Sequence, residues 1–307
     1  MTLHTKMQGL ALALCVLVAP AFGQQAGTSA LDSIGVVATG ASLKQVSSQF
    51  TFTEGPTVDK KGTIYFTDQP NDKIWSYDTD GKLALYMDKT GRSNGLYIDK
   101  RGNLLACADQ KSELWSISPD KKVTVLLANY EGRRFNGPND LWQHPKGGIY
   151  FTDPFYARPY WEHKEQPMAK QSVYYLPEGK TEAVLVDDEL QQPNGIVGSP
   201  DGKHLYVADI RANKTYKYDI AKDGSLTNRQ LFVEQGSDGM TLDNKGNLYL
   251  TGRGVTVYSP AGKKMGNIPV PSRWVGNICF GGKDRKTLFI TASESVYTLA
   301  MAVKGIE

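Results

Sequence analysis

A short pattern recurs six times along the chain, and this repetition limits the possible folds more than any other feature. Each copy is a run of β-branched, aromatic and small apolar residues, in most copies after a turn rich in Gly, Asp and Lys. Successive copies lie about 40 to 55 residues apart, the spacing of four-stranded blades in a β-propeller. The copies are residues 62–68, 102–109, 148–153, 202–209, 246–252 and 286–292. The chain is therefore predicted to be an all-β, six-bladed propeller.

Each copy is flanked by strand-like segments that complete a four-stranded unit. A first strand precedes the turn, as in residues 56–59, and a third follows, as in residues 73–78. A fourth strand follows in five units, but only residues 301–307 remain after the last third strand. We expect residues 43–49 to complete the last blade, because such closure removes an exposed sheet edge. An open sandwich explains neither the sixfold repeat nor the missing strand.

The first residues have the pattern of a secretory signal peptide rather than of a folded segment. Lys6 precedes an apolar run over residues 10–22, and residues 21–23 are suited to cleavage. The run is shorter than the roughly 20 apolar residues of a membrane span, although an uncleaved anchor is the alternative. Export to the periplasm or secretion is therefore expected. The predicted division is signal peptide, linker and a single propeller domain, over residues 1–23, 24–40 and 41–307.

Charge and cysteine content argue against several kinds of site. The formal net charge is +3 with the basic residues spread along the sequence, which is not the pattern of a nucleic-acid-binding surface. Cys107 and Cys279 both lie in apolar strand-like segments, so two buried thiols are expected in preference to a disulfide. The sequence has no CxxC pair that would suit a structural zinc ion. No nucleic acid, membrane or obligate protein partner is indicated.

One polar residue recurs at the start of the first strand in every unit. In a propeller the first strands line the central channel, so these side chains are expected to form a ring at one face. Carboxylates and carboxamides supply only oxygen ligands, a set that suits Ca²⁺ with its roughly six to eight oxygens. Turn formation alone is the alternative for any single Asn-Gly or Asp-Gly pair. The ring positions are Glu54, Asn94, Asn139, Asn194, Asp238 and Asn277.

The histidines are expected to lie away from this ring. One falls in the predicted signal peptide, two lie at or beside the turns of the opposite face, and one lies in a long loop. A Ser-His-Asp triad or a histidine zinc site therefore has little support. The four residues are His4, His144, His163 and His204.

Several segments together carry a family resemblance. They are residues 52–56, 134–140, 149–154, 192–195 and 237–240. With them the chain, over residues 47–299, resembles the senescence-marker-protein/gluconolactonase (regucalcin-type) family of calcium-dependent lactonases. The resemblance implies hydrolysis of a sugar-type lactone, of unspecified ring size, with one divalent cation. Ca²⁺ is expected, with Mg²⁺, Mn²⁺ and Zn²⁺ as alternatives.

Carried over position by position, the resemblance also implies roles for single residues. The implied cation ligands are Glu54, Asn139, Asn194 and Asp238. Asp238 is also the implied general base, which activates water for attack on a lactone carbonyl polarised by the cation. Arg134 and Asn136 are implied to face the substrate. Two further functions remain open: phosphotriester hydrolysis at the same site, and ligand binding without catalysis.

Strand parity adds one further expectation. If the first strands run away from the ring, the second strands return to it, and the loop that follows them lies beside the site. In the third unit this loop, residues 155–170, is long. Long loops on rigid scaffolds often carry specificity. Tyr156 and Trp161, with Tyr160, are expected to cover part of a bound sugar ring, and a plain surface excursion is the alternative.

Overall fold

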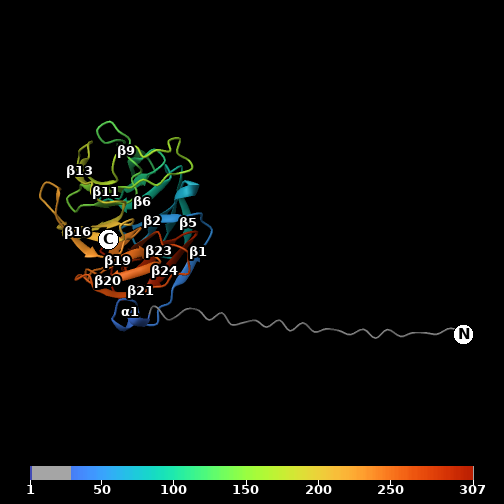
Figure 1. Ribbon diagram of the computed structural model, residues 1–307. Coiled ribbons are helices and arrows are strands. Elements are labelled where there is room, and N and C mark those ends of the chain that lie inside the picture. The colour runs from blue at the N-terminus through green and yellow to red at the C-terminus, as the bar shows by residue number, and fades with distance from the viewer. Residues whose placement is uncertain (2–28, 307) are drawn as a thin grey trace.

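The fold is a closed ring of β-sheets. The structure is a computed structural model that describes Met1 and residues 29–306. Over residues 29–306 the strands form six four-stranded antiparallel sheets grouped around one centre (Figure 1). This arrangement confirms the predicted six-bladed β-propeller. Apart from Met1, the predicted signal peptide lies outside the described residues.

The first three blades each use four consecutive strands, numbered from the axis outward. Blade 1 contains β2 (Thr53–Val58), β3 (Ile64–Asp68), β4 (Lys73–Tyr77) and β5 (Leu83–Asp88). Blade 2 contains β6 (Ser93–Ile98), β7 (Leu104–Ala108), β8 (Glu113–Ile117) and β9 (Val123–Leu127). Blade 3 contains β10 (Leu141–Gln143), β11 (Ile149–Asp153), β12 (Ser172–Leu176) and β13 (Val184–Asp187).

Blades 4 and 5 repeat this order, and blade 6 departs from it. Blade 4 contains β14 (Pro193–Gly198), β15 (His204–Asp209), β16 (Lys214–Ile220) and β17 (Leu226–Val233). Blade 5 contains β18 (Met240–Leu242), β19 (Leu248–Gly252), β20 (Gly254–Tyr258) and β21 (Lys264–Ile268). Blade 6 contains β22 (Asn277–Gly281), β23 (Thr287–Ala292), β24 (Ser295–Ala300) and β1 (Lys44–Ser47).

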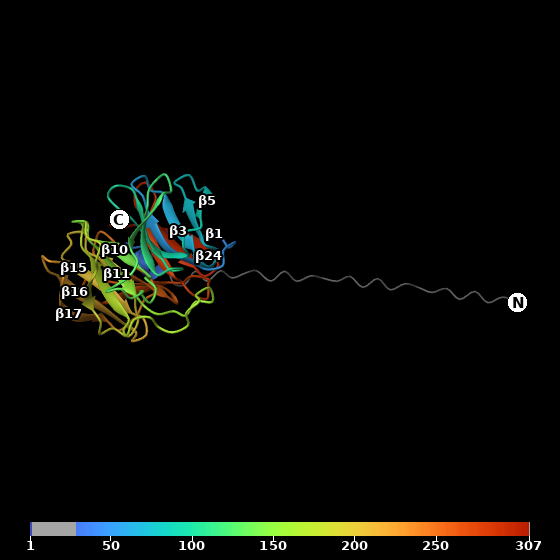
Figure 2. The same ribbon diagram turned by 90° about the horizontal axis from the view of Figure 1, so that it is seen from above.

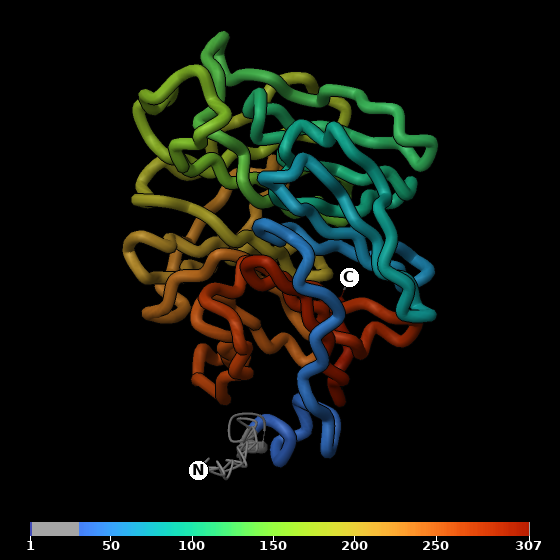
Figure 3. The backbone as a smooth tube through the Cα atoms, turned by 90° about the vertical axis from the view of Figure 1, so that its right-hand side faces the viewer, coloured from blue at the N-terminus to red at the C-terminus, as the bar shows by residue number. Residues whose placement is uncertain are grey.

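The N-terminal strand closes the propeller as predicted. Strand β1 pairs antiparallel with β24, with Lys44 opposite Thr298 and Gln45 opposite Tyr297. In Figure 3 the N-terminal segment runs beside the C-terminal blade. Because the outermost strand of blade 6 comes from the other end of the chain, the two ends are held together by sheet hydrogen bonds.

Residues 29–40, which the sequence assigns to a linker, pack against the propeller. They begin with the short helix α1 (Ser29–Ser33), which lies next to β21 (Figure 1). Leu31 is fully buried, and Val37 forms an isolated bridge with Met301. This segment therefore adds apolar contacts across blades 5 and 6.

Burial falls from the axis outward. The inner strands β2, β14 and β22 are buried along their whole length, whereas β17 is mostly exposed. Figure 2 shows β15, β16 and β17 side by side at one edge of the molecule. The inner strands are therefore covered by neighbouring blades, whereas the outer strands face solvent.

Side chains between blades form the core. Phe66 of blade 1 lies 5.2 Å from Phe289 of blade 6, measured between ring centroids. Cys107 and Cys279 are buried and not joined by a disulfide, as expected. A short 3₁₀ helix, η1 (Gln69–Asn71), follows β3. Within the described residues no helix is both long enough and apolar enough to cross a membrane.

Candidate functional site: the ring at the propeller axis

Glycines allow the ring positions of adjacent blades to touch. A Cβ atom on Gly55 would lie 2.0 Å from the carbonyl oxygen of Asn94, and one on Gly276 would lie 2.7 Å from Oε1 of Glu54. Only a residue without a side chain permits such an approach, and Gly55 also has a positive φ of 42°. Blade 1 is therefore in direct contact with blades 2 and 6 at the level of the predicted ring.

Hydrogen bonds and close contacts join the remaining blades at the same level. The Gly95 amide donates to the Asn139 carbonyl at 2.8 Å, which connects blades 2 and 3. A Cβ on Gly195 would lie 2.5 Å from the Asp238 carbonyl, which connects blades 4 and 5. The Gly239 amide donates to the Gly276 carbonyl at 2.8 Å, which connects blades 5 and 6.

In blades 1 and 3, a threonine near the end of the second strand donates a hydrogen bond to the ring segment of the next blade. The Thr67 hydroxyl donates to the Asn94 carbonyl at 3.1 Å, and the Thr152 hydroxyl donates to the Asn194 carbonyl at 2.8 Å. Thr152 thereby connects blades 3 and 4, which completes the circle of contacts. Each of these two threonines therefore holds the ring segment of the next blade.

Two carboxylates of this ring, the buried Glu54 and the half-buried Asp238, lie close enough for the charge of one to act on the other. Burial, and then the negative charge of Asp238, raise the pKa of Glu54 well above its usual range. Burial raises the pKa of Asp238 to about 6, although hydrogen bonds from Trp274 and Asn194 oppose the shift. The Trp274 indole nitrogen lies 2.6 Å from Oδ2 of Asp238. Both carboxylates therefore lack a full counter-charge, the condition in which a bound cation is favourable.

Asn194 carries the clearest sign of an unfilled interaction. Its Nδ2 donates to the Tyr156 hydroxyl at 2.8 Å, but its buried Oδ1 has no hydrogen-bond partner. A buried carbonyl oxygen without a partner costs about 1–3 kcal/mol. This oxygen and those of Glu54 and Asp238 are the hard ligands that Ca²⁺ prefers, so the residues present fit such an ion.

The ring is not a conventional cluster of ionisable ligands. Among residues 29–306 no group of three or more His, Cys, Asp or Glu side chains is arranged to hold a metal. Asn139 is buried, and its backbone oxygen belongs to the contact with Gly95. Amide oxygens would therefore supply half of the proposed ligand set, with two carboxylates carrying the charge.

Asp140 is an axial residue that the sequence analysis missed. It follows Asn139 directly, and its Oδ2 accepts a hydrogen bond of 3.3 Å from Nδ2 of Asn277. Since blades 3 and 6 lie on opposite sides of a six-bladed ring, this bond crosses the axis. Burial raises the pKa of Asp140 to about 7. The sixfold repeat assigned the ring position to Asn139. The carboxylate that directly follows it in the sequence could have indicated Asp140 as a second axial residue.

The structure brings one of the predicted substrate residues, Tyr156, to the ring, whereas Arg134 is hydrogen-bonded to blade 2. Arg134 donates from Nε to the Ser112 hydroxyl at 3.1 Å and from Nη2 to the Gln110 carbonyl at 2.9 Å. Both partners belong to the turn after β7. Tyr156, by contrast, contacts Asn194 directly.

Asn136 and Trp161 are buried, and their polar side-chain atoms are hydrogen-bonded within the protein. The Asn136 amide donates to the carbonyls of Asp153 and Lys170 and accepts from the Met168 amide. Trp161, only 3% exposed, donates from its indole nitrogen to the Asp109 carbonyl at 2.9 Å. Both side chains therefore anchor the 155–170 loop rather than present a surface to a ligand.

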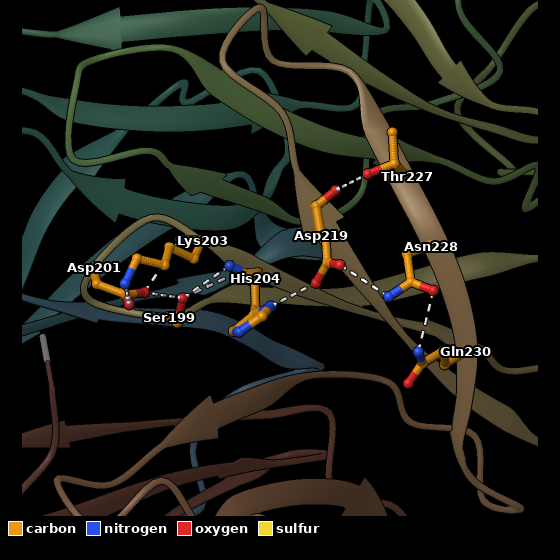
Figure 4. A network of polar contacts seen from close by, with 8 residues as sticks. All are labelled: Ser199, Asp201, Lys203, His204, Asp219, Thr227, Asn228 and Gln230. Carbon is orange, nitrogen blue, oxygen red and sulfur yellow. Dashed lines mark hydrogen bonds and ion pairs between the residues drawn. The ribbon is translucent and has the colours of Figure 1, made fainter.

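His144 and His204 take part in local contacts at the turn end, and His163 stacks on Trp161 at 4.8 Å between ring centroids. Figure 4 shows the polar network on blade 4, where Nδ1 of His204 lies 2.9 Å from Asp219. The Ser199 hydroxyl in this network accepts from the His204 backbone amide, not from its ring. The serine is therefore not activated by the imidazole, and the network stabilises a turn. His144 contacts the Gly202 carbonyl at 3.0 Å.

The fold and the ring define a six-bladed propeller with an oxygen-rich centre. A family model described as the SMP-30/Gluconolactonase/LRE-like region matches residues 52–294, and the chain belongs to this family.

Individual relatives agree with this placement. A gluconolactonase from Zymomonas mobilis is 30% identical over 298 residues, which cover 87% of this chain and 82% of the relative. The solved gluconolactonase from Xanthomonas campestris has a TM-score of 0.81 at 29% identity, covering 89% of this chain and 93% of that one. A calcium-binding regucalcin from Agrobacterium tumefaciens shares the fold, with a TM-score of 0.72 at 20% identity and coverage of 86% and 95%.

Proposed function

We infer that the protein is a lactonase that opens a sugar-type lactone with the help of one divalent cation. Family membership and the relatives named gluconolactonase support the enzyme class. The observation that supports the cation is the unpartnered Oδ1 of Asn194 near two carboxylates, Glu54 and Asp238, whose pKa values are raised by loss of solvent. We assign Glu54, Asn139, Asn194 and Asp238 as the residues that would hold it, with Ca²⁺ as the favoured ion.

Asp238 has the features of a general base in this reaction. When bound, the cation would supply polarisation of the lactone carbonyl and stabilisation of developing negative charge. Trp274 donates to Oδ2 of Asp238 and so fixes the orientation of the carboxylate. Asp238 would take a proton from water as the water oxygen bonds to the carbonyl carbon. The ring ester C–O bond then breaks, and the proton passes to the leaving oxygen, which gives a hydroxy acid.

Tyr156 is positioned to bind the substrate. Its hydroxyl accepts from Asn194, which leaves the hydroxyl hydrogen free for a lactone oxygen. Burial, and then the charge of Asp238, raise the pKa of Tyr156, so the phenol keeps its proton at neutral pH. Arg134, bonded to the turn after β7, would contact larger substrates. Asn136 and Trp161 would act by holding the 155–170 loop.

We also propose that the mature protein is exported. The positive start and apolar run of residues 1–23 support this proposal. Fractionation of cells that produce the full chain should place the protein outside the cytoplasm with its N-terminus near residue 24. A cytoplasmic protein that retains these residues would contradict it.

The activity can be tested with purified protein and two substrate classes. Turnover of δ-gluconolactone, followed by acid release, is expected to require a divalent cation and to stop with chelator. Hydrolysis of a phosphotriester under the same conditions should be slower by orders of magnitude. Failure to hydrolyse any lactone in the presence of Ca²⁺, Mg²⁺, Mn²⁺ or Zn²⁺ would refute the proposed function.

A further inference from the structure

The loop after β11 is held over the ring end of the molecule by contacts with blades 2 and 4. The Trp161 indole and the Tyr160 hydroxyl both donate to Asp109 of blade 2. The Gln192 amide donates to the Phe155 carbonyl at 3.3 Å from blade 4. Residues 155–161 are thus fixed from both sides, and Arg158 lies in the middle of this fixed segment.

Arg158 lies close to the ring and is partly open to solvent. Its side chain is 22% exposed, and its guanidinium carbon is 5.4 Å from the centre of the Tyr156 ring. Its Nε lies 3.3 Å from Oδ2 of Asp109. No described residue accepts a hydrogen bond from its terminal nitrogens. Arg158 therefore offers two donor groups beside the residue that contacts Asn194.

The charge of Arg158 reaches both ring carboxylates. It lowers the pKa of Glu54 from blade 1 and of Asp238 from blade 5, opposing the larger effect of burial. Among the described residues it is the one cation that acts on both. This agrees with its contact with Tyr156, whose hydroxyl is bonded to Asn194, and places Arg158 near the ring.

The orienting carboxylate, Asp109, departs from the repeat. The equivalent Asp68, Asp153 and Asp209 each accept two backbone N–H groups from the loop that leads into the first strand of their own blade. In blade 2 this loop is held instead by Asp72, which accepts from the Arg92 amide at 2.7 Å. Asp109 is thereby released from the structural role of its counterparts and pairs with Arg158 and Tyr160.

We propose that Arg158 is a specificity-determining substrate residue, whose terminal nitrogens bind neighbouring oxygen substituents of a polyhydroxylated lactone and the carboxylate of its product. The planar donor fork of arginine suits paired oxygens, and an alkyl lactone offers it none beyond the ester itself. Asp109 and Tyr160 are positioning residues that hold the guanidinium. This inference rests on the proposed lactonase function.

The test compares two substrates in the intact cation-loaded protein. Arg158→Ala is expected to raise KM for δ-gluconolactone by about 10- to 100-fold and to change kcat/KM for δ-valerolactone by less than about threefold. Arg158→Lys should recover part of the loss, because it restores charge without the fork. Arg101→Ala, which removes an exposed arginine of a turn at the opposite end, is the matched control and should leave both substrates unchanged.

Three results separate the possible outcomes. Equal loss on both lactones, or no loss on either, in a folded Arg158→Ala protein would overturn the role of Arg158. Absence of turnover in the unmodified protein would refute the lactonase function instead. Calorimetry with gluconate then tests whether Arg158 binds the carboxylate of the product. Gluconate binding that weakens at least tenfold in Arg158→Ala supports the assignment. Gluconate binding that is absent or equal in both proteins overturns it.

Discussion

Carboxylates in the turns and carboxylates of the axial ring are hydrogen-bonded differently. At the turn end, Asp59, Asp99 and Asp243 occupy one repeated position. Each accepts two backbone N–H groups of its own turn at 2.8 or 2.9 Å. In the axial ring, the buried Glu54 and the half-buried Asp238 lie close together, and loss of solvent raises the pKa of both.

The difference separates stability from function. The turn carboxylates have hydrogen-bond partners, as polar groups in protein interiors normally do. Underpaired carboxylates with shifted pKa values, together with an unpartnered amide oxygen at Asn194, are instead typical of functional sites. Substitutions at the two ends should therefore affect different properties.

The largest effect is expected at Asp238. Asp238→Asn should lower kcat/KM for δ-gluconolactone by about 10²- to 10⁴-fold, because the proton acceptor is lost. The melting temperature measured by circular dichroism without added metal should stay the same or rise, since a partly desolvated charge without a full counter-charge is removed. Normal turnover in this variant would remove Asp238 from the mechanism.

The matched change at the turn end should act on stability alone. Asp243 also accepts hydrogen bonds from the Asn247 amide and the Tyr249 hydroxyl and is 1% exposed. Asp243→Ala should lower the free energy of unfolding by about 2–3 kcal/mol, because several buried donors lose their acceptor. At 25 °C its kcat/KM should remain within about twofold of the parent. A large loss of activity without loss of stability would contradict the division between the two ends.

A smaller effect, which depends on pH, is expected at Asp153. Burial raises its pKa to about 7 in the folded protein, whereas an unfolded aspartate titrates near pH 3.9. Its contribution is therefore present below about pH 4 and is lost as the pH rises toward 7, by at most about 1.4 kcal/mol per pH unit. Urea unfolding at pH 5 and pH 8 should show a larger loss in the parent than in Asp153→Asn, in which Glu54, Asp140 and Asp238 still titrate. Parallel profiles for the two proteins would contradict the shift.

The sequence predicted the features that repeat. Six copies of one strand pattern predicted the blades, the closing strand β1 and the ring positions, because a closed propeller places equivalent residues at equivalent distances from its axis. The same logic located the 155–170 loop beside the ring. It also directed attention to Asn139 and away from the neighbouring Asp140.

What could not be predicted lies where the repeat is broken. The loop has no periodicity, so nothing in the sequence distinguished Arg158, which contacts Tyr156, from Trp161, which is buried against blade 2. Asn136 was assigned to the substrate by resemblance, but its amide bonds are used to hold the loop. The role of Asp109 depends on contacts with residues about 50 positions away, as in its hydrogen bond to Tyr160.

Calorimetric titration of chelator-treated protein with Ca²⁺ tests the central claim most directly. The ring of Glu54, Asn139, Asn194 and Asp238 predicts one ion per chain, and Glu54→Gln should weaken binding by at least about 100-fold because a buried charged ligand is lost. Binding of no divalent cation, or equal binding by the parent and Glu54→Gln, would contradict the account.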